Sequence, residues 1–435
     1  MIARTAEKRM TTFILVAIGQ IVSVTGSGLT GFALGAWVYR ETHSTTQFSL
    51  ILLFTVLPSL LISPLAGTLV DRWDRRWVMI LSDSGAALCT AVLVVLIYFG
   101  RLEIWHIYGI MGLSSILRGF QVPAYLASVS LLVPKEQLGR ANGIMQFEST
   151  SSYLLSPVLA GWLMENIGVA GVMAIDFATF LFAVVIVLAV RFPKPEITDE
   201  EKQVRGSLWR EALFGWRYIS ARSGFLSLLV LFALGNYANL MTDTLLPPML
   251  LDFTSPSIVG SVLSAGGLGM LAGTLVMSAW GGPKRRIHAV LIFKTMAGLA
   301  IMLMGIFQSI PLVAVATFLY YFPFPFVNGC DQAIWQSKVP ASMQGRVFAT
   351  RRMLAYSMIP LAYVTAGPLS DKVFKPLLTT SGSLASSLGP FFGTGAGRGM
   401  GLLIFLMGLS IVLLTAITSL NPHVRNIEAE LPDAV

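Results

Sequence analysis

Five carboxyl side chains fall inside long apolar stretches of the chain, where an acidic residue is costly and therefore a candidate for function. They are Asp83, Glu148, Asp176, Asp243 and Asp331. Such a carboxyl couples transport to protons if its proton affinity depends on which side of a membrane it faces. Glu148 and Asp243 are the first candidates, because each shares its stretch with other polar side chains. For every one of the five, a buried structural pair is the alternative.

One guanidinium also lies inside an apolar stretch. Arg118 sits in the run Leu117–Gln121. A guanidinium at this depth is costly unless it faces a water-filled cavity or a partner, which makes Arg118 a candidate for both substrate binding and proton coupling. A structural tie to Asp71 or Glu148 is the equally open alternative.

Other chemistries lack the residues that they need. The chain has 2 cysteines and 4 histidines, and neither set has the spacing of a disulfide framework or a metal site. No phosphate-binding Gly-x-x-x-x-Gly-Lys-Ser/Thr loop, Gly-x-Ser-x-Gly elbow or His-Glu-x-x-His pair occurs. The sequence therefore predicts a protein that is not an enzyme and that uses no metal and no cofactor.

The elements that must position these side chains are membrane helices. With 55% hydrophobic and 12% charged residues, the chain has too few polar side chains to cover a water-soluble body. Twelve apolar stretches long enough to cross a hydrocarbon core of about 30 Å begin near Phe13, Phe48, Trp77, Trp105, Ala141, Val169, Gly224, Ile258, Ala289, Pro311, Met353 and Gly401. We expect an all-α, multi-pass protein whose first stretch is a retained helix rather than a signal peptide.

Basic residues set the expected orientation, because Lys and Arg accumulate on the cytoplasmic side of a membrane. With the N-terminus inside, the external loops hold only Arg40, Arg101, Lys372, Lys375 and Arg398. We therefore expect a bacterial inner-membrane protein with both termini in the cytoplasm. Topology and contact with anionic lipid headgroups then account for the net charge of +8 without a nucleic-acid partner.

The two halves of the chain repeat one another. Residues 66–70 recur letter for letter at 272–276, and the same shift of 206 carries Gly139-Arg140 onto Gly345-Arg346. Internal repeats of this kind are typical of transporters that alternate between two faces of a membrane. The repeat predicts two pseudo-symmetric six-helix bundles, residues 1–191 and 223–435.

A polar segment, residues 192–222, joins the two predicted bundles. It carries an acidic run at 199–201 and then spaced aromatic residues at 209, 214 and 216. This pattern indicates an amphipathic helix on the inner leaflet, and a plain solvated linker is the alternative.

The strongest motif is the inner loop between the second and third stretches, which reads Gly-Thr-Leu-Val-Asp-Arg-Trp-Asp-Arg-Arg over residues 67–76. It resembles the signature loop of the major facilitator superfamily, with Asp74 in place of the usual glycine. The resemblance implies twelve transmembrane helices in two six-helix bundles. We interpret the loop as a charged latch that holds one conformer, formed by Gly67, Asp71, Arg72, Arg75 and Arg76.

In this latch, Asp71 is expected near the start of a neighbouring helix, where exposed amides and the helix dipole favour a carboxylate. The arginines are expected to stay in the water of the headgroup region. Simple anchoring by positive charge accounts for the arginines but not for Asp71. The second half keeps Lys284, Arg285 and Arg286 but has no acid in this loop, so the latch is expected to be asymmetric.

Two weaker motifs follow the same family. Residues 117–121 are similar to its arginine pattern in the fourth helix, and residues 152–161 resemble a degenerate form of its antiporter signature. Pro157 bends this fifth span, and small residues let helices approach closely; they are Ser152, Ser156, Ala160 and Gly161. Helix packing without any link to export is the alternative.

The resemblance also implies which residues line the transport path, since the first helix of each three-helix unit does so in this fold. The candidates are Gln20, Arg118, Gln121, Asn236, Tyr237, Asn239, Tyr321, Phe324 and Asn328. Asp83 and Asp176 fall on third helices and are expected at the periphery. Aromatic rings with scattered amides suit a bulky amphiphile better than a sugar, although such rings also pack against helices or lipid.

Within the superfamily, the chain resembles the macrolide-efflux and enterobactin-exporter branch. The run at 71–76 leading into Ile80–Asp83, and Leu132–Pro134 before Ala141–Gly143, carry this likeness. It implies a monomeric secondary transporter in membrane lipid that exports an amphiphilic small molecule in exchange for protons by alternating access. A lipid or lysolipid translocator of the same fold, and a non-transporting sensor or scaffold, are the alternatives.

Overall fold

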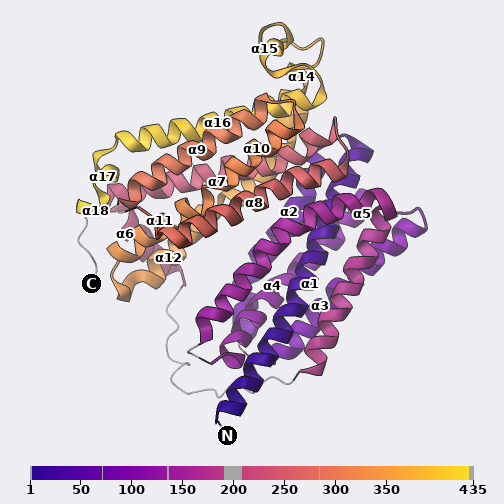
Figure 1. Ribbon diagram of the computed structural model, residues 1–435, viewed down its shortest axis with the longest axis vertical. Helices are drawn as coiled ribbons and strands as arrows, with labels where there is room; N and C mark the ends of the chain where they lie inside the picture. Colours follow the sequence, from indigo (N-terminus) through magenta and orange to yellow (C-terminus); the bar gives the residue numbers. More distant parts are fainter. Residues whose placement is uncertain (1, 71, 135–136, 191–207, 284, 431–435) are drawn as a thin grey trace. The chain divides into compact units, whose positions relative to one another are not determined.

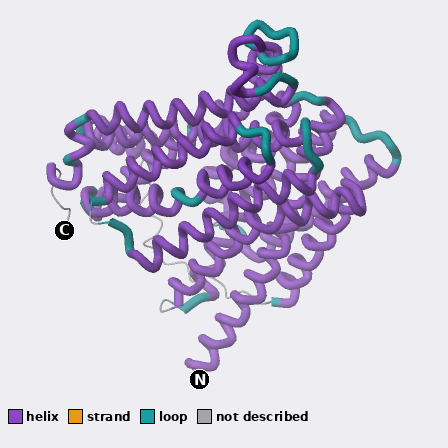
Figure 2. The backbone as a smooth tube through the Cα atoms, turned by 45° about the horizontal axis from the view of Figure 1, so that its top comes forward, coloured by secondary structure: helices purple, strands orange, loops and turns teal. Residues whose placement is uncertain are grey.

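The computed structural model describes residues 2–70, 72–134, 137–190, 208–283 and 285–430. Asp71 and the first part of the predicted linker lie outside this set. The described residues form helices joined by turns and loops, and they contain no strand (Figure 2). The chain divides into two compact units, Met1–Ile197 with Thr254–Ser264, and Thr198–Phe253 with Ala265–Val435.

The first unit is a bundle of long helices (Figure 1). They are α1 (Ile2–Thr42), α2 (Thr45–Val70), α3 (Arg75–Tyr98), α4 (Ile104–Leu132) and α5 (Leu138–Ala189). Helix α1 packs along α5, α2 packs against α4, and α3 packs against both α4 and α5. Gly168 interrupts α5 with a φ of 70°, a conformation that other residues rarely adopt. This break separates the two spans predicted near Ala141 and Val169.

The second unit contains the remaining helices. They are α6 (Leu208–Ser220), α7 (Ser223–Leu251), α8 (Pro256–Trp280), α9 (Arg286–Ile306), α10 (Ile310–Tyr321), α11 (Phe324–Lys338), α12 (Ala341–Tyr356), α13 (Met358–Leu369), α14 (Lys375–Leu377), α15 (Ala385–Phe392), α16 (Ala396–Leu420), α17 (Pro422–Arg425) and α18 (Ile427–Glu430). A π-helical segment, Ser370–Phe374, joins α13 to α14. The first turns of α8 group with the first unit. Within the second unit, α9 packs against α10, α11 and α16, and α7 packs against α13 and α16.

Across the described residues, nine helical segments are long and apolar enough to cross a bilayer. One of them, α5, makes two crossings on either side of Gly168. With α4 and the α12–α13 pair, the total agrees with the twelve spans predicted, and the all-α membrane fold is confirmed. The apolar stretch predicted to begin near Met353 lies within a longer helical region, because the helix already begins at Ala341. Its first turns carry Arg346 and Arg351, whose charge hides the helix from an apolar pattern.

Helix α6 occupies the described end of the predicted linker. Ile219 is buried, and the Arg346 guanidinium of α12 lies 5.6 Å from the centre of the Phe214 ring. Leu213 and Trp216 are exposed. The helix therefore has one face packed on protein and an apolar remainder on the surface, while its contact with the inner leaflet stays a prediction.

Two apolar clusters in the first unit leave a polar layer between them. Along α1, Phe13 and Val16 belong to one cluster, and Leu34 and Val38 belong to the other. The residues between them on this helix include Gln20, Ser23 and Thr30, all of them buried. The polar side chains thus gather midway along the helix, between the two apolar clusters.

Candidate functional site

A hydrogen-bonded cluster in this polar layer ties three helices together. The amide of Gln121 on α4 donates to Oε1 of Gln20 on α1 at 2.5 Å and to Oδ1 of Asp83 on α3 at 3.0 Å. Gln20 in turn donates to the other oxygen of Asp83 at 3.4 Å. Asp83 is only 2% exposed. Both oxygens of this carboxyl are therefore held by amides rather than by a basic side chain.

A second carboxyl lies among hydroxyl groups. Oδ2 of Asp176, in the second half of α5, accepts hydrogen bonds from Thr30 of α1 at 2.7 Å and from Thr90 of α3 at 3.4 Å. Thr179, one turn along α5, lies 3.5 Å from the other oxygen. Asp176 is 1% exposed. Like Asp83, it is a buried acid held by neutral donors.

Arg118 stands between these two acids. Its positive charge interacts with both Asp176 and Asp83, yet in the described part of the chain it makes no hydrogen bond and no ion pair within 4 Å. Arg118 lines two cavities, one of about 210 Å³ and one of about 440 Å³. The smaller cavity also contains Gln20, Asp83, Gln121 and Glu148, and the larger contains Asp176. The guanidinium thus lies beside cavities that three carboxyl groups line.

Glu148 on α5 faces the Tyr125 hydroxyl of α4 across the smaller cavity. Oε2 of Glu148 and the Tyr125 hydroxyl are both buried, and neither makes a hydrogen bond of normal geometry in the regions that the structure describes. No hydrogen bond or ion pair there joins Glu148 to Arg118 either, so the expected alternative of a structural tie between them is not seen. A carboxyl oxygen that is buried without a full hydrogen bond can accept a proton or a water molecule.

The expectation that Asp83 and Asp176 pack at the periphery is wrong. Both line the cavities that Arg118 lines. The physical reason is that α3 and the second half of α5 pack directly against α1 and α4, so their polar faces turn inward. The position of a helix within its three-helix unit does not determine which way one side chain points.

In the second unit, four of the residues predicted for the cavity come together. Asn236, Asn239, Phe324 and Asn328 line a cavity of about 30 Å³, and Lys294 of α9 lines it with them. Lys294 lies inside an apolar stretch of the sequence, as Arg118 does, but it was not predicted as a site residue, although the cost of burying its charge was the signal for it.

The two predicted tyrosines in this unit have other partners. The Tyr237 hydroxyl lies 2.9 Å from the hydroxyl of Thr365 on α13, and the Tyr321 hydroxyl donates to Asp243 at 2.9 Å. The Tyr321 ring also contacts the ring of Phe324, with centroids 5.6 Å apart. Asp243, the second candidate for proton coupling, is therefore held by an aromatic hydroxyl from α10.

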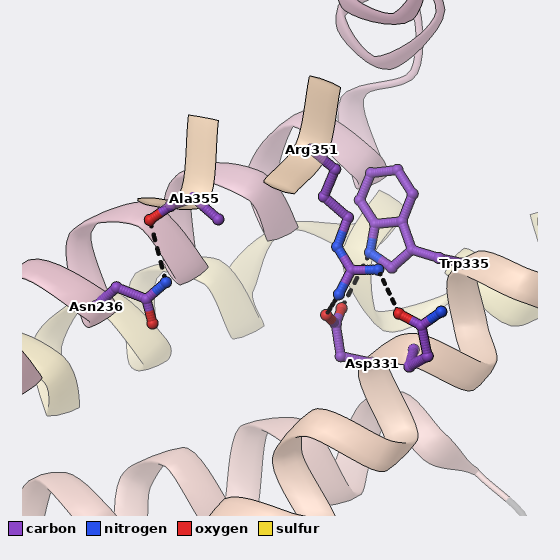
Figure 3. Close-up of polar contacts among 6 residues, drawn as sticks. Asn236, Asp331, Trp335, Arg351 and Ala355 are labelled. Carbon is purple, nitrogen blue, oxygen red and sulfur yellow. Dashed lines mark hydrogen bonds and ion pairs between the residues drawn. The ribbon is translucent and has the colours of Figure 1, made fainter. Parts of the chain in front are cut away.

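Asp331 lies in a polar cluster between α11 and α12 (Figure 3). Arg351 forms an ion pair with Oδ2 of Asp331, and the Trp335 indole donates to Oδ1 at 3.0 Å. Arg351 also donates to Gln332 at 3.0 Å. Asn236 of α7 donates to the carbonyl oxygen of Ala355 at 3.2 Å, as the same view shows. Asp331 thus forms a buried structural pair with Arg351, which was the alternative to a role in proton coupling.

The predicted latch is described in part, since Asp71 lies outside the described residues. Arg72 is exposed, next to the end of α2 that carries Gly67. Asp74, the departure from the family pattern, caps α3 by accepting a hydrogen bond from the Arg76 amide at 2.9 Å. This cap gives the substituted residue a local structural role.

Arg75 and Arg76 are half-buried and hydrogen-bond to helix carbonyls, while their place in the headgroup region stays a prediction. Arg75 donates to the carbonyl oxygen of Ala127 in α4 at 2.9 Å. Arg76 donates to Val187 and Leu188, in the last turn of α5, at 3.1 and 2.5 Å. The final carbonyls of a helix lack partners within the helix and attract positive charge, which explains the contacts of Arg76.

The second half has a similar contact to the equivalent carbonyl, although its arginine does not lie at the 206-residue shift from Arg75. Arg286 donates to the carbonyl oxygen of Ala333 at 3.4 Å, and Ala333 is Ala127 moved by 206 residues. The loop of this half has no acid, but Glu428 of α18 accepts a hydrogen bond from the Ile287 amide in the first turn of α9 at 3.1 Å. The carbonyl oxygen of Glu428 accepts a hydrogen bond from Lys338 at 2.6 Å. The C-terminal segment thus supplies a carboxylate at a helix start that the loop itself leaves without one.

Glu428→Gln is expected to lower the melting temperature, because the start of α9 loses a negative charge worth about 0.5–1 kcal/mol. Glu430→Gln is the matched control, since Glu430 contacts only the exposed His423 in the described structure. Thermal unfolding of the purified variants measures the difference. Equal melting temperatures for the two variants would show that Glu428 does not stabilise α9.

The small residues of span five do pack helices closely. Ser152 and Ser156 donate to the carbonyl oxygens of Val24 and Thr25 on α1 at 3.3 and 3.0 Å. Ala160 is fully buried in a cluster on the same side. On the opposite side, a β-carbon at Gly161 would lie 2.4 Å from the carbonyl oxygen of Pro256, within the part of α8 that belongs to the first unit. Pro157 lies inside this helix.

Comparison with known proteins gives a consistent family. The sequence model of the family described as Major Facilitator Superfamily matches residues 16–363. Macrolide efflux protein A of Streptococcus pyogenes is 26% identical over 365 residues, covering 83% of this chain and 90% of that protein. Multidrug efflux pump Tap of Mycolicibacterium fortuitum is 23% identical over 367 residues, covering 82% and 89%.

Solved structures share the fold. A bacterial homolog of the human lysosomal transporter Spinster, inward-facing and unoccupied, has a TM-score of 0.69 at 13% identity, covering 94% of this chain and 95% of that one. A bacterial homologue of the iron transporter ferroportin, in its inward-facing state, has a TM-score of 0.64 at 13% identity, covering 95% and 99%. At such identity the likeness concerns the fold alone.

Proposed function

The chain belongs to the Major Facilitator Superfamily, and from this premise we propose that it exports a hydrophobic or amphiphilic small molecule in exchange for protons. It is a multi-pass membrane transporter and not an enzyme. Relatives that match most of its length are named for macrolide efflux and multidrug efflux. These names support export of a drug-like compound.

Proton coupling is supported by the balance between acidic and basic side chains in the first unit. Asp83, Glu148 and Asp176 line the two cavities that share Arg118. With all three carboxyls ionised, one guanidinium would face three negative charges in a layer that lies between two apolar clusters. Proton uptake relieves this imbalance, and proton release restores it. We assign the exchanged proton to Glu148, the carboxyl without a hydrogen-bond partner on one oxygen.

The larger cavity supports an amphiphilic substrate. Its volume of about 440 Å³ lies within the range of small-molecule sites. Hydroxyl groups such as Thr30 and Thr55 line it together with apolar side chains such as Leu93 and Phe180. A mixed lining of this kind binds a bulky apolar body through surface contact and orients it through a few hydrogen bonds.

The proposed orientation rests on the distribution of basic residues, and the proposed alternation rests on the internal sequence repeat. The transporter works as a monomer in a bacterial inner membrane, with both termini in the cytoplasm. Two six-helix bundles, residues 1–191 and 223–435, alternate in opening to the two faces, with the segment 192–222 between them. Asp71 and the arginines of its loop hold one of the two conformers.

Glu148→Gln is expected to abolish proton-driven accumulation of a radiolabelled amphiphilic drug in proteoliposomes, while exchange of labelled for unlabelled drug persists. Exchange persists because it needs no release of a proton. Asp243→Asn tests the second candidate in the same assay. Glu41→Gln, an exposed acid at the end of α1, is the control and should behave as the unmodified protein does.

Intact proton-driven transport in the double variant with Glu148→Gln and Asp243→Asn would remove both acids from the mechanism. Transfer of labelled lipid in the same vesicles without a gradient would favour the lipid translocator instead. Absence of both activities in protein that is inserted and folded would favour the sensor or scaffold.

A further inference from the structure

The second unit holds a buried ammonium group that the proposed proton exchange does not use. Lys294 is 5% exposed, and within the described residues its Nζ atom makes no hydrogen bond and no ion pair. Nζ lies 4.5 Å from the centre of the Phe232 ring, where a cation is attracted to the aromatic face. Gly235 leaves room for it, since a β-carbon at that position would lie 2.6 Å from Nζ.

The neighbouring charges do not neutralise Lys294. The carboxylate of Asp331 is near enough to attract it electrostatically. Both oxygens of Asp331 are already engaged, however, one by Arg351 and the other by the Trp335 indole (Figure 3). Two cations therefore share one carboxylate, and one positive charge remains. An uncompensated buried charge is strongly unfavourable, so an anion that reached Lys294 would be bound firmly.

The cavity beside Lys294 has the size and lining of an anion subsite. Its volume of about 30 Å³ holds one or two water-sized groups, which fits the two oxygens of a carboxylate and not a whole drug molecule. Asn239 and Asn328 line it and make no hydrogen bond among the described residues, so their amides are available as donors. Phe232 and Phe324 supply the apolar part of the wall.

We propose that this cavity binds the carboxylate, or another compact oxyanion, of the exported amphiphile, with Lys294 as its counter-charge. The inference rests on the proposed export function and names the substrate class, an apolar or aromatic compound that carries one acidic group. The acidic group enters the cavity between Lys294 and the amides. The apolar body stays outside this cavity, because the space cannot hold it.

The test compares an acid with its neutral ester. The protein is placed in phosphatidylcholine nanodiscs, and binding of 9-anthracenecarboxylate and of its methyl ester is followed by fluorescence anisotropy against protein-free nanodiscs. The unmodified protein should prefer the acid. Lys294→Met should weaken acid binding by about tenfold or more, the effect of losing a charge-assisted hydrogen bond, and leave ester binding unchanged. Lys372→Met, at an exposed lysine, is the matched control.

A second variant moves the ammonium without removing its charge. Gly235→Ala places a methyl carbon 2.6 Å from Nζ, closer than the two atoms can pack, so the flexible lysine chain must withdraw. Acid binding should weaken while the melting temperature is maintained, since alanine favours a helix over glycine. Gly109→Ala is the control, because no atom lies within 4 Å of the added carbon there. Unchanged acid binding in Gly235→Ala would contradict the assigned position of the ammonium.

Melting temperatures without ligand separate the inference from a structural role. If Lys294 is uncompensated, Lys294→Met should raise the melting temperature, whereas a structural counter-charge for Asp331 would make it fall. Three results would overturn the proposal. They are no binding of the acid to the unmodified protein, equal binding of acid and ester to it, or an equal weakening of acid binding and ester binding in Lys294→Met. Loss of the acid preference when phosphatidylglycerol replaces a third of the lipid assigns the cavity to a lipid headgroup and overturns the substrate class.

The proposed function is tested separately in the proteoliposomes. Proton-driven transport together with equal binding of acid and ester would remove only this inference. A preference for the acid that depends on Lys294, without gradient-driven transport, would remove the proposed function and keep the anion subsite.

Discussion

Arg118→Met is expected to abolish gradient-driven transport, by on the order of a hundredfold, since removing the counter-charge of a buried carboxylate costs about 3 kcal/mol or more. Asp83 and Asp176 would lose the one positive charge between them, and the cavities would keep three carboxyls. Protons would then stay bound in both conformers, and exchange would be uncoupled from the gradient. Uptake into proteoliposomes with and without a pH difference measures the loss.

Two further variants make this result specific. Arg118→Lys keeps the charge and should recover part of the transport, because the residue holds no fixed bidentate contact among the described side chains. Arg101→Met, outside the helices and exposed, should transport normally. If Arg118→Met folds poorly, Asp83→Asn in the same chain should restore folding by removing an unbalanced acid. Normal gradient-driven transport in Arg118→Met would show that the guanidinium takes no part in coupling.

The membrane fold could be predicted from the sequence, because it depends on the length and composition of the apolar stretches. Apolar length sets the crossings, and the shift of 206 residues reveals the two halves even where single residues differ. The structure adds that the carbonyl oxygens of Ala127 and Ala333, which lie 206 residues apart, each accept a hydrogen bond from an arginine, although the two arginines are not at equivalent positions. Boundaries were harder, as at α12, where arginines in the first turns mask a helix that extends beyond the apolar core.

Some residues of the candidate site could be predicted from the sequence, but the residues that they contact could not. The cost of burying a charge singled out Arg118 from the sequence, and the same rule applied to Lys294 would have found it. No sequence pattern indicates that Arg118 lies near Asp83 and Asp176, because the rotation of α3 and α5 about their axes is decided by packing against α1 and α4. Contacts over long sequence separations, such as that of Glu428 with the start of α9, leave no local signal at all.

Asp331→Asn is expected to destabilise the second unit more than Arg351→Met does, although the two residues form one ion pair. Without Asp331, the buried Lys294 and the half-buried Arg351 are two cations with no carboxylate, a loss of about 3 kcal/mol or more. Without Arg351, Asp331 keeps the hydrogen bond from Trp335 and the charge of Lys294. Which of the two variants is less stable therefore depends on whether the Lys294 side chain is charged.

Melting temperatures of the purified variants give this order directly. Lys294→Met added to Asp331→Asn should recover part of the lost stability, because it removes one of the two unbalanced cations. Asp371→Asn, which breaks the ion pair with Lys375 four residues along the chain, is the control and should cost about 0–1 kcal/mol. If Arg351→Met is at least as unstable as Asp331→Asn, the charge of Lys294 does not compensate Asp331. The second unit would then hold an isolated ion pair and a neutral lysine, without the excess positive charge that an anionic substrate requires.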